Sequence, residues 1–337
     1  MKESDIRNRD ALQQYLQMVR EECRTFFSIS DIDTVVCPAC DEDDYIPQFG
    51  KEGFEYVVCR KCDTLYARNR PNQHSLNAFY SESKSSHFWI EHFFSPMVEK
   101  RREKIFRPRA SFLLEHFGND PHWEVGDIGA GFGIFLEELR KIWPESRYLA
   151  VEPSSEQARI CENNGFEVEN SAIEEIGEQY YRKFSLITAF ELFEHLYSPS
   201  QFVEKVHTLL KPDGTLLLTT LNGQGFDIAV LWENSKSIYP PCHINFFNPR
   251  SMELFLKRKG FAIIEIETPG NLDWNIVENE ITMGSDSVRN ERFWNIFSQY
   301  GSNGAKNELQ SFIRKNNLSS HMRVIAKKDI NKRGVRL

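Results

Sequence analysis

Four of the seven cysteines in this 337-residue chain form two Cys-x-x-Cys pairs. The first pair is Cys37 and Cys40, the second is Cys59 and Cys62, and 18 residues separate the pairs. Two such pairs at this separation bring four thiolates into the tetrahedron that Zn²⁺ prefers. The segment between them has apolar runs on either side of a turn at 50–53, as in a β-hairpin. The spacing predicts a four-cysteine zinc ribbon, with two disulfides or a redox pair as alternatives.

A site with four thiolate ligands is closed, because no position on the metal remains for water or substrate. We therefore expect a structural zinc that folds a segment too short to bury a core of its own. Residues 41–44 are all acidic and would repel a phosphate backbone, so we interpret them as a solvated turn. The other cysteines, Cys23, Cys161 and Cys242, are expected to be small buried residues.

A glycine-rich segment follows an apolar run at 124–128, and residues 129–133 read Gly-Ala-Gly-Phe-Gly. Glycines allow a tight turn and a close approach of the backbone to a ligand at a helix N-terminus. A dinucleotide site would have its third glycine at position 134, where this chain has Ile134. Glu152 ends the next apolar run, where a carboxylate can accept both hydroxyls of a ribose. The alternatives are a purely structural turn for the glycine loop and a surface acid for Glu152.

Short apolar strands alternate with amphipathic helices from residue 123 onward. The expected strands are 124–128, 147–152, 167–169, 184–190, 215–221, 262–267 and a final 322–327. The expected helices are 133–142, 155–164, 199–210 and 249–259. This alternation predicts an α/β fold with a doubly wound, mainly parallel, seven-stranded Rossmann-like sheet.

Four segments in this region together resemble class I S-adenosylmethionine-dependent methyltransferases, in the order and at the intervals of that family. They are residues 127–133, 151–153, 187–196 and 210–216, and the resemblance covers about 123–268. It implies S-adenosylmethionine as the cofactor. The binding residues that it implies are Asp127, Gly129, Ala130, Gly131 and Gly133 for the methionine end, Glu152 for the ribose with Pro153 next to it, Ala172 and Ile173 for the adenine, and Phe190 beside the methionine. Two departures are Ser185 and the segment 170–174, where many relatives carry Asp.

Three residues are candidates for the chemistry of transfer, namely His195, His243 and Glu194. A sulfonium methyl is already activated, so an enzyme mainly aligns the nucleophile, and a hydroxyl nucleophile also needs a base. His195 follows the fourth expected strand and His243 follows the fifth, and a helix-capping or core histidine is the alternative for each. Glu191, Glu194 and His195 also resemble a motif that binds metal in quinone-biosynthesis O-methyltransferases, which implies a divalent cation such as Mg²⁺.

A wider resemblance concerns bacterial methyltransferases of surface-glycan and nucleotide-sugar pathways. The ribbon, the aromatic segment that follows it, and residues 243–247 and 318–322 carry it. It implies O-methylation of a sugar or nucleotide-linked sugar in carbohydrate biosynthesis. The alternatives are C- or N-methylation of such a sugar, a quinone-type O-methylation, an RNA base methylation and a scaffold without catalysis. Residues 189–192 read Ala-Phe-Glu-Leu and lack the Pro-Pro of amino-directed base methyltransferases.

Composition is that of a globular protein, with 40 % apolar and 27 % charged residues. The 41 Lys and Arg against 49 Asp and Glu give a net charge of −8, which argues against a nucleic-acid partner. No apolar run approaches the ~18 residues of a membrane span, and the start lacks a secretory signal. We therefore expect a cytoplasmic enzyme with a small-molecule substrate and no membrane partner.

The expected organisation has seven parts. They are an N-terminal helix at 1–30, the zinc ribbon at 31–70, an aromatic helical linker or lid at 71–118, the cofactor-binding core at 119–268, a helical insertion at 269–318, the final core strand at 319–330 and a tail at 331–337.

Overall fold

A computed structural model describes residues 2–119, 122–284, 288 and 292–329. Its main feature is a seven-stranded sheet with the order β12-β13-β10-β9-β6-β7-β8. The strands are β6 (Glu124–Ile128), β7 (Arg147–Val151), β8 (Glu167–Glu169), β9 (Phe184–Phe190), β10 (Leu210–Leu221), β12 (Phe261–Glu267) and β13 (His321–Lys328). Within it β6 to β10 pair in parallel, and β13 runs antiparallel between β10 and β12. The predicted fold class is confirmed.

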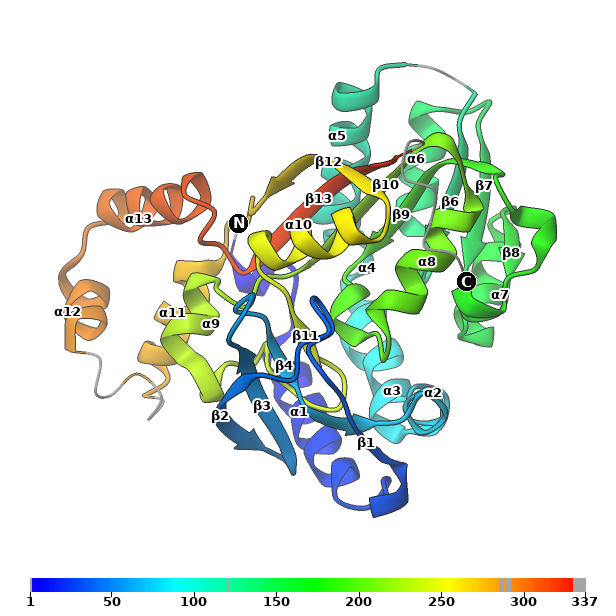
Figure 1. Cartoon of the computed structure of the whole chain (residues 1–337). Coiled ribbons are helices and arrows are strands. Elements are labelled where there is room, and N and C mark those ends of the chain that lie inside the picture. The colour runs from blue at the N-terminus through cyan, green and yellow to red at the C-terminus, as the bar shows by residue number, and fades with distance from the viewer. Residues whose placement is uncertain (1, 120–121, 285–287, 289–291, 330–337) are drawn as a thin grey trace.

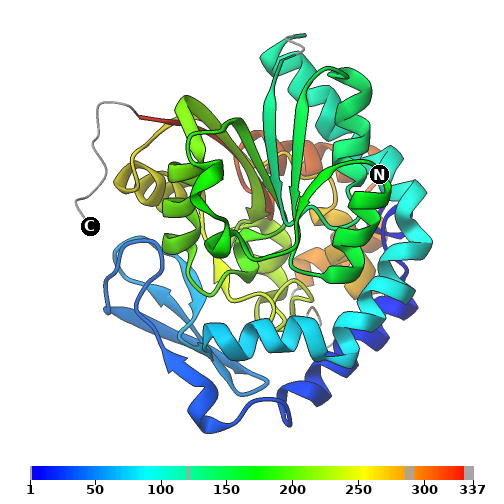
Figure 2. The same ribbon diagram turned by 90° about the vertical axis from the view of Figure 1, so that its right-hand side faces the viewer.

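Helices cover both faces of this sheet, as Figures 1 and 2 show. The helices α8 (Pro199–Leu209) and α10 (Pro249–Arg258) pack on one face. On the other face lie α5 (Arg107–Phe117), α6 (Ile134–Ile142) and α7 (Ser155–Asn163). Alternate strand residues supply the two cores, because successive side chains of a strand point to opposite faces. Leu217 belongs to one core and its neighbour Leu218 to the other.

A second sheet has four strands in the order β11-β4-β3-β2. Three come from the cysteine-containing segment, namely β2 (Tyr45–Lys51), β3 (Phe54–Cys59) and β4 (Leu65–Ala67). The fourth, β11 (Asn245–Phe246), comes from the chain that follows β10. A two-stranded sheet of β1 (Ile32–Thr34) and β5 (Asn69–Pro71) flanks this segment. The sequence predicted the hairpin but not the strand that joins it from the core.

Helices from the first third of the chain pack beside the second sheet (Figure 2). They are α1 (Arg9–Cys23), α2 (Gln73–Glu82) and α3 (Lys84–Phe88). Further helical turns, including α4 (Val98–Arg101), lead from α3 into α5. The side chain of Asn8 caps α1 by accepting hydrogen bonds from the backbone of Asp10 and Ala11. Tyr15 of α1 and Phe79 of α2 share a buried cluster with Phe54 of β3.

Between β12 and β13 the chain forms a helical lobe, drawn in orange in Figure 1. Its described helices are α11 (Asp273–Thr282), α12 (Arg292–Tyr300) and α13 (Asn303–Lys315), and α9 (Phe226–Leu231) packs against α11. Trp274 and Leu231 belong to the apolar cluster of this lobe. The expected tail at 331–337 lies outside the described residues. No helix among the residues that the structure describes is long and apolar enough to cross a membrane.

Candidate active site at the carboxyl edge of the sheet

The glycine loop joins β6 to α6 at the carboxyl edge of the sheet. Gly129, Gly131 and Gly133 all have positive φ angles, of 71°, 57° and 70°. A Cβ at position 133 would also lie 3.0 Å from the Sγ of Cys161. The backbone amides of Gly129 and Ala130 donate to the carbonyl of Val151, at 2.9 and 3.2 Å. The loop is therefore pinned to the end of β7, and its conformation requires glycine.

Two buried carboxyl groups flank this loop. Asp127 lies near the end of β6, just before the loop, and its Oδ1 accepts a hydrogen bond from the Thr188 hydroxyl at 2.6 Å. Burial raises the pKa of Asp127 to about 7, although Thr188 and the charge of Arg109 oppose this rise. Glu152 follows β7, and accepts hydrogen bonds from the amides of Gly131 and Ser154 at 2.8 and 2.9 Å. Burial raises its pKa as well.

The other residues proposed for the cofactor lie along the same edge. Asn170 donates to the carbonyls of Glu152 and Pro153, at 2.9 and 3.1 Å, and so ties the end of β8 to the end of β7. Ala172 caps a short 3-10 helix, and the side chain of Ile173, the first residue of that helix, is buried in the core. These contacts bring the ends of β7 and β8 together beside the glycine loop.

Phe190 ends β9 and contacts Arg109, a residue that the sequence did not single out. The guanidinium of Arg109 lies 4.5 Å from the centroid of the Phe190 ring, and its Nη2 donates to the Glu191 carboxylate at 2.8 Å. Arg109 stands on α5, before the glycine loop in the chain, and nothing in its spacing marked it. Only the fold brings Arg109 close to Asp127 and Glu191.

The two candidate histidines meet in the structure. The ring centroids of His195 and His243 are 4.5 Å apart, with the planes at 79°. Nδ1 of His243 lies 2.7 Å from the carbonyl oxygen of Ser237, so Nδ1 carries the proton and the lone pair is on Nε2. Nδ1 of His195 lies 2.9 Å from the hydroxyl of Tyr80, a residue of α2. Tyr80 belongs to the aromatic segment expected as a linker or lid, but the sequence did not single it out as a site residue.

Burial keeps both imidazoles neutral. It lowers the pKa of His195 to about 4, and burial together with the nearby His195 lowers the pKa of His243 well below its usual range. Tyr239 lies against His243, with ring centroids 4.0 Å apart. A neutral imidazole with a free Nε2 is the form that accepts a proton.

Glu191 and Glu194 belong to one sequence motif but have opposite surroundings. Glu191 accepts hydrogen bonds from Arg109 and from the Thr219 hydroxyl, the latter at 2.6 Å, and lies 3.4 Å from Nδ1 of His321. Burial alone would raise its pKa, but the charges of His321 and Arg109 hold it at about 2. Glu194 accepts from Thr220 at 2.8 Å, and burial together with Glu191 raises its pKa to about 8.

This difference changes the expected divalent-cation group. One ligand atom each of Glu194, His195 and His243 lie within 4.8 Å of one another. Glu191, which the sequence placed with Glu194 and His195, instead pairs with Arg109 and His321. Glu194 and His195, which are adjacent in the motif, therefore lie close to His243, almost fifty positions later in the chain. This is possible because the chain after β10 returns to this edge of the sheet.

The four paired cysteines also come together. Their sulfurs are unbonded, with Sγ–Sγ distances of 3.5 Å for Cys37–Cys62, Cys40–Cys59 and Cys40–Cys62. Tetrahedral thiolates at ~2.3 Å from a zinc ion are separated by ~3.8 Å, so the four sulfurs fit such an ion. A disulfide would require a separation of ~2.05 Å.

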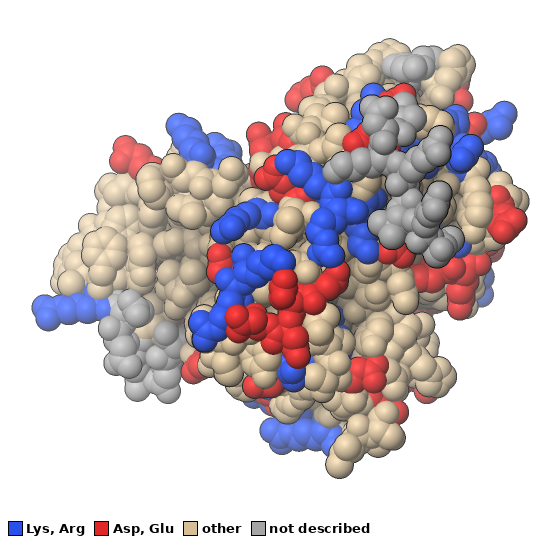
Figure 3. Space-filling view, viewed as in Figure 1, with Lys and Arg blue, Asp and Glu red and all other residues tan. Residues whose placement is uncertain are grey.

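The acidic run after the first pair is neutralised within the protein. Asp43 pairs with Arg68 and Asp44 with Arg60, each at 3.2 Å, and Glu42 pairs with Lys61. Asp41 pairs with Arg258 of α10. Figure 3 shows acidic and basic side chains intermixed across the middle of one face, rather than a broad field of either sign.

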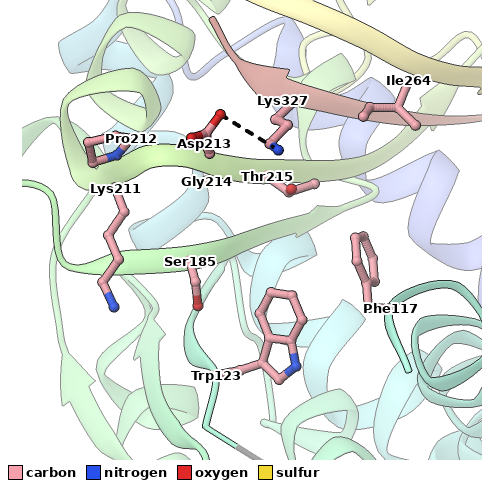
Figure 4. Close-up of a pocket in the computed structure, with 10 residues that line it drawn as sticks. All are labelled: Phe117, Trp123, Ser185, Lys211, Pro212, Asp213, Gly214, Thr215, Ile264 and Lys327. Carbon is pink, nitrogen blue, oxygen red and sulfur yellow. Dashed lines mark ion pairs between the residues drawn. The ribbon is translucent and has the colours of Figure 1, made fainter. Parts of the chain in front are cut away.

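A pocket of about 310 Å³ lies at the opposite edge of the sheet. Figure 4 shows Trp123 before β6, Ser185 near the start of β9 and Lys211 near the start of β10 in its wall, with an ion pair of 3.6 Å between Asp213 and Lys327. The glycine loop and the two histidines lie at the carboxyl ends of these strands. This pocket is therefore separate from the candidate active site.

Comparison with known proteins agrees with this geometry. Residues 97–266, half of the chain, match the family model of a methyltransferase domain. The ubiquinone biosynthesis O-methyltransferase of Salmonella paratyphi A is 28 % identical over 149 residues, 43 % of this chain and 60 % of that protein. The mitochondrial enzyme of the same name from Bos taurus is 25 % identical over 155 residues, 42 % of this chain and 41 % of that protein. The chain thus spans about three fifths or less of these relatives.

A solved structure of a Burkholderia thailandensis 1,6-didemethyltoxoflavin-N1-methyltransferase is similar with a TM-score of 0.47 and 14 % identity, covering 84 % of this chain and 99 % of that one. With half of its residues matched by the family model, the chain belongs to the methyltransferase domain family.

Proposed function

We propose that the protein is an S-adenosylmethionine-dependent methyltransferase that acts on a small molecule, with a hydroxyl of a sugar or nucleotide-linked sugar as the acceptor. The observation that carries this proposal is the arrangement at one edge of the sheet. There the glycine loop, Asp127 and Glu152 lie at the ends of β6 and β7, and two neutral histidines contact each other edge to face beyond the end of β9. Cofactor and acceptor sites would then share one edge.

The carboxyl groups fit the cofactor that the family uses. Glu152 accepts two backbone hydrogen bonds, and an ionised carboxylate has about four acceptor positions, so it can also accept from ribose hydroxyls. Asp127 is buried without a salt bridge, and a cationic amino group near it would favour its ionised form. When bound, S-adenosylmethionine supplies a methyl group already activated on a sulfonium sulfur.

His243 is the proposed base. Its Nδ1–H donates to Ser237, which fixes the ring and directs the lone pair of Nε2 away from that carbonyl. Nε2 of His243 would take the proton of the acceptor hydroxyl. The hydroxyl oxygen would gain the methyl group as the bond from that methyl to the sulfonium sulfur breaks, and S-adenosylhomocysteine would leave as the neutral thioether. His195 lies edge-on to this ring, and its Nδ1 contacts Tyr80. We assign His195 and Tyr80 to orienting the acceptor and to holding water out of the site.

One structural metal belongs to the proposal, and a second metal is the alternative to His243 as the base. Cys37, Cys40, Cys59 and Cys62 would hold a structural zinc, in agreement with their sulfur separations. The group of Glu194, His195 and His243 offers a second role for the histidines, because the Nδ1 of each is engaged and Nε2 is left for a ligand bond. Two imidazoles and one carboxylate suit zinc or another transition metal better than Mg²⁺.

The acceptor has one competing candidate that a specific observation favours. The curated relatives are named as ubiquinone biosynthesis O-methyltransferases, which supports oxygen as the acceptor atom and a phenolic hydroxyl as the alternative substrate. The sugar proposal rests on the wider resemblance that includes the ribbon and residues 318–322. A nucleic-acid substrate has less support, since Arg60 and Arg68, which could otherwise contact phosphates, are paired with acids of the ribbon.

The first test is a calorimetric titration of the protein with S-adenosylhomocysteine. We expect micromolar binding that is lost in Asp127→Ala and Glu152→Ala and is kept in Asp213→Ala, a control acid at the opposite edge. Transfer from radiolabelled cofactor to nucleotide sugars, free sugars and catechols then identifies the acceptor. Absence of binding to the folded, zinc-loaded wild type would overturn the proposal and leave the scaffold reading.

The metal content distinguishes the two roles of the histidines. One tightly bound metal per chain, lost on mutation of the cysteines and unchanged in His243→Ala, would support the base. A second metal that disappears only in His243→Ala and Glu194→Gln would support the metal-assisted alternative.

A further inference from the structure

The chain that carries His243 is built into the sheet of the ribbon. β11 pairs antiparallel with β4, with Asn245 opposite Tyr66 and Phe246 opposite Leu65. The amide of Ala67 also donates to the carbonyl of Ile244 at 3.0 Å. The residues next to His243 therefore take their backbone geometry from the cysteine-containing segment. Figure 1 shows β11 beside β4, below the main sheet.

Two buried side chains of the ribbon segment reinforce this strand. The hydroxyl of Tyr56 donates to the backbone carbonyl of His243 itself, at 2.7 Å. The guanidinium of Arg70 is 1 % exposed, and donates to the carbonyl of Ile244 at 3.2 Å and to Oδ1 of Asn245 at 2.9 Å. A buried arginine requires such partners to offset the cost of leaving water.

Ile244 and Asn245 are also hydrogen-bonded to the segment that contains His195. The amide of Ile244 donates to the carbonyl of Glu194 at 3.0 Å, and Nδ2 of Asn245 donates to the carbonyl of Leu196 at 2.6 Å. His195 lies between these two acceptors in the chain. The ribbon, the His243 segment and the His195 segment are thus joined by consecutive hydrogen bonds.

The cysteine cluster is tied to the same segment. Nδ2 of Asn248, which caps α10, donates to the carbonyl of Cys62 at 2.9 Å. Arg258 near the end of α10 donates to the carbonyl of Ala39, between the first two cysteines. All four cysteines belong to the same apolar cluster as Phe247. A change at the four sulfurs would therefore reach β11 through direct contacts.

We infer that the four-cysteine ribbon is the positioning element for the two histidines, with Tyr56 and Arg70 as positioning residues that hold the backbone at His243. The catalytic role of the histidines in this inference rests on the proposed function. The hydrogen bonds that join the ribbon to the His243 segment do not depend on it. In this interpretation the ribbon positions residues of the active site and does not bind a ligand of its own. A purely stabilising ribbon would affect all parts of the protein alike.

The sharpest test is Tyr56→Phe with Tyr66→Phe as its matched control. Both tyrosines are fully buried in the ribbon, but the Tyr66 hydroxyl has no hydrogen-bond partner. Tyr56→Phe removes only the bond to His243, and one such bond changes a local equilibrium by about five- to tenfold. We expect ¹⁵N resonances of the His243 ring to shift and kcat to fall about five- to tenfold, with KM for the cofactor unchanged. Tyr66→Phe should do neither.

The affinity for S-adenosylhomocysteine separates failure of this inference from failure of the proposed function. Equal His243 spectra in wild type, Tyr56→Phe and Tyr66→Phe would overturn the positioning role, whatever the enzyme methylates. Loss of cofactor binding in Tyr56→Phe would also overturn it, because the variant would then have a general folding defect. The resonance measurement does not require the substrate to be known, because the spectra are recorded on the ligand-free protein.

Hydrogen exchange of the full chain, with and without its zinc, gives a second measurement. After chelation we expect amides in 239–248 to lose protection by about tenfold or more while 124–133 keep theirs. Uniform loss in both segments would make the ribbon a general stabiliser and overturn the inference. Unchanged protection of 239–248 in protein shown to be metal-free would overturn it as well.

Discussion

Replacing Asp127 by Asn should stabilise the ligand-free protein at alkaline pH while abolishing cofactor binding. The side chain is 2 % exposed and accepts one hydrogen bond, from Thr188. Burial raises the pKa of this carboxyl from 3.8 to about 7. Asn has nearly the same size and keeps an oxygen that accepts from Thr188, but it never ionises.

The magnitude follows from the linkage between protons and folding. An acid whose pKa is higher in the folded protein costs stability as pH rises from the unfolded value, and the loss is complete above the folded value. The interval from 3.8 to about 7 corresponds to ~4 kcal/mol for Asp127, of which ~2 kcal/mol falls between pH 5.5 and 8.5. The stability of Asp127→Asn relative to wild type should therefore rise by that amount across this range.

Urea unfolding of both proteins at the two pH values measures the effect, and the difference between them cancels the other titrating groups. Asp213→Asn, at the exposed turn of the opposite edge, is the control for the loss of one carboxylate outside the core. Titration with S-adenosylhomocysteine should show binding to wild type and none to Asp127→Asn. Parallel pH dependences for wild type and Asp127→Asn would refute the argument that burial strains this carboxylate.

Three further predictions concern the loop, the ribose acid and the base. Glu152→Gln should weaken binding of S-adenosylhomocysteine about 10- to 100-fold, because a charged acceptor becomes neutral, and equal affinity by calorimetry would contradict its role. Gly133→Ala should lower the free energy of unfolding by ~1 kcal/mol more than Gly53→Ala, since both have positive φ but only the former meets the Sγ of Cys161. His243→Asn should slow transfer by about 10²- to 10⁴-fold with cofactor affinity unchanged, and wild-type rates would exclude it as the base.

Local patterns predicted the main sheet well. Strand β6 at Glu124–Ile128 and strand β9 at Phe184–Phe190 have the predicted bounds, because short apolar runs between glycines and polar turns admit few other interpretations. The predicted 215–221 strand is longer in the structure, where β10 starts at Leu210 and shifts register before Thr215. Residues 211–214 read Lys-Pro-Asp-Gly, which is typical of a turn, so the sequence did not predict a strand that begins before them.

The neighbours of the proposed site residues were not predictable in the same way. Tyr80, Arg109 and His321 come from parts of the chain far from the glycine loop, and no spacing relates them to it. The expected group of Glu191 with Glu194 and His195 followed helical spacing, but Glu191 has a positive φ of 52° and turns toward Arg109. Contacts between distant segments decide which acid of a motif faces the histidines, and a single sequence does not contain that information.

The segment from the end of β10 to β11 explains why a ribbon would be retained beside a complete methyltransferase sheet. Residues 222–244 include the short helix α9 and a 3-10 turn at Trp232–Asn234, and the rest follows an irregular path. Long irregular loops carry a large entropy cost of ordering. His243 stands at the end of this stretch, where a base must be held to a fraction of an ångström. The ribbon offers a partner strand to Asn245 and Phe246 and a hydrogen bond to His243, and so orders the final residues from outside the sheet. Deleting residues 31–70 should then leave the contacts among β6, β7 and the glycine loop, while the His243 segment loses each of the anchors that come from that part of the chain.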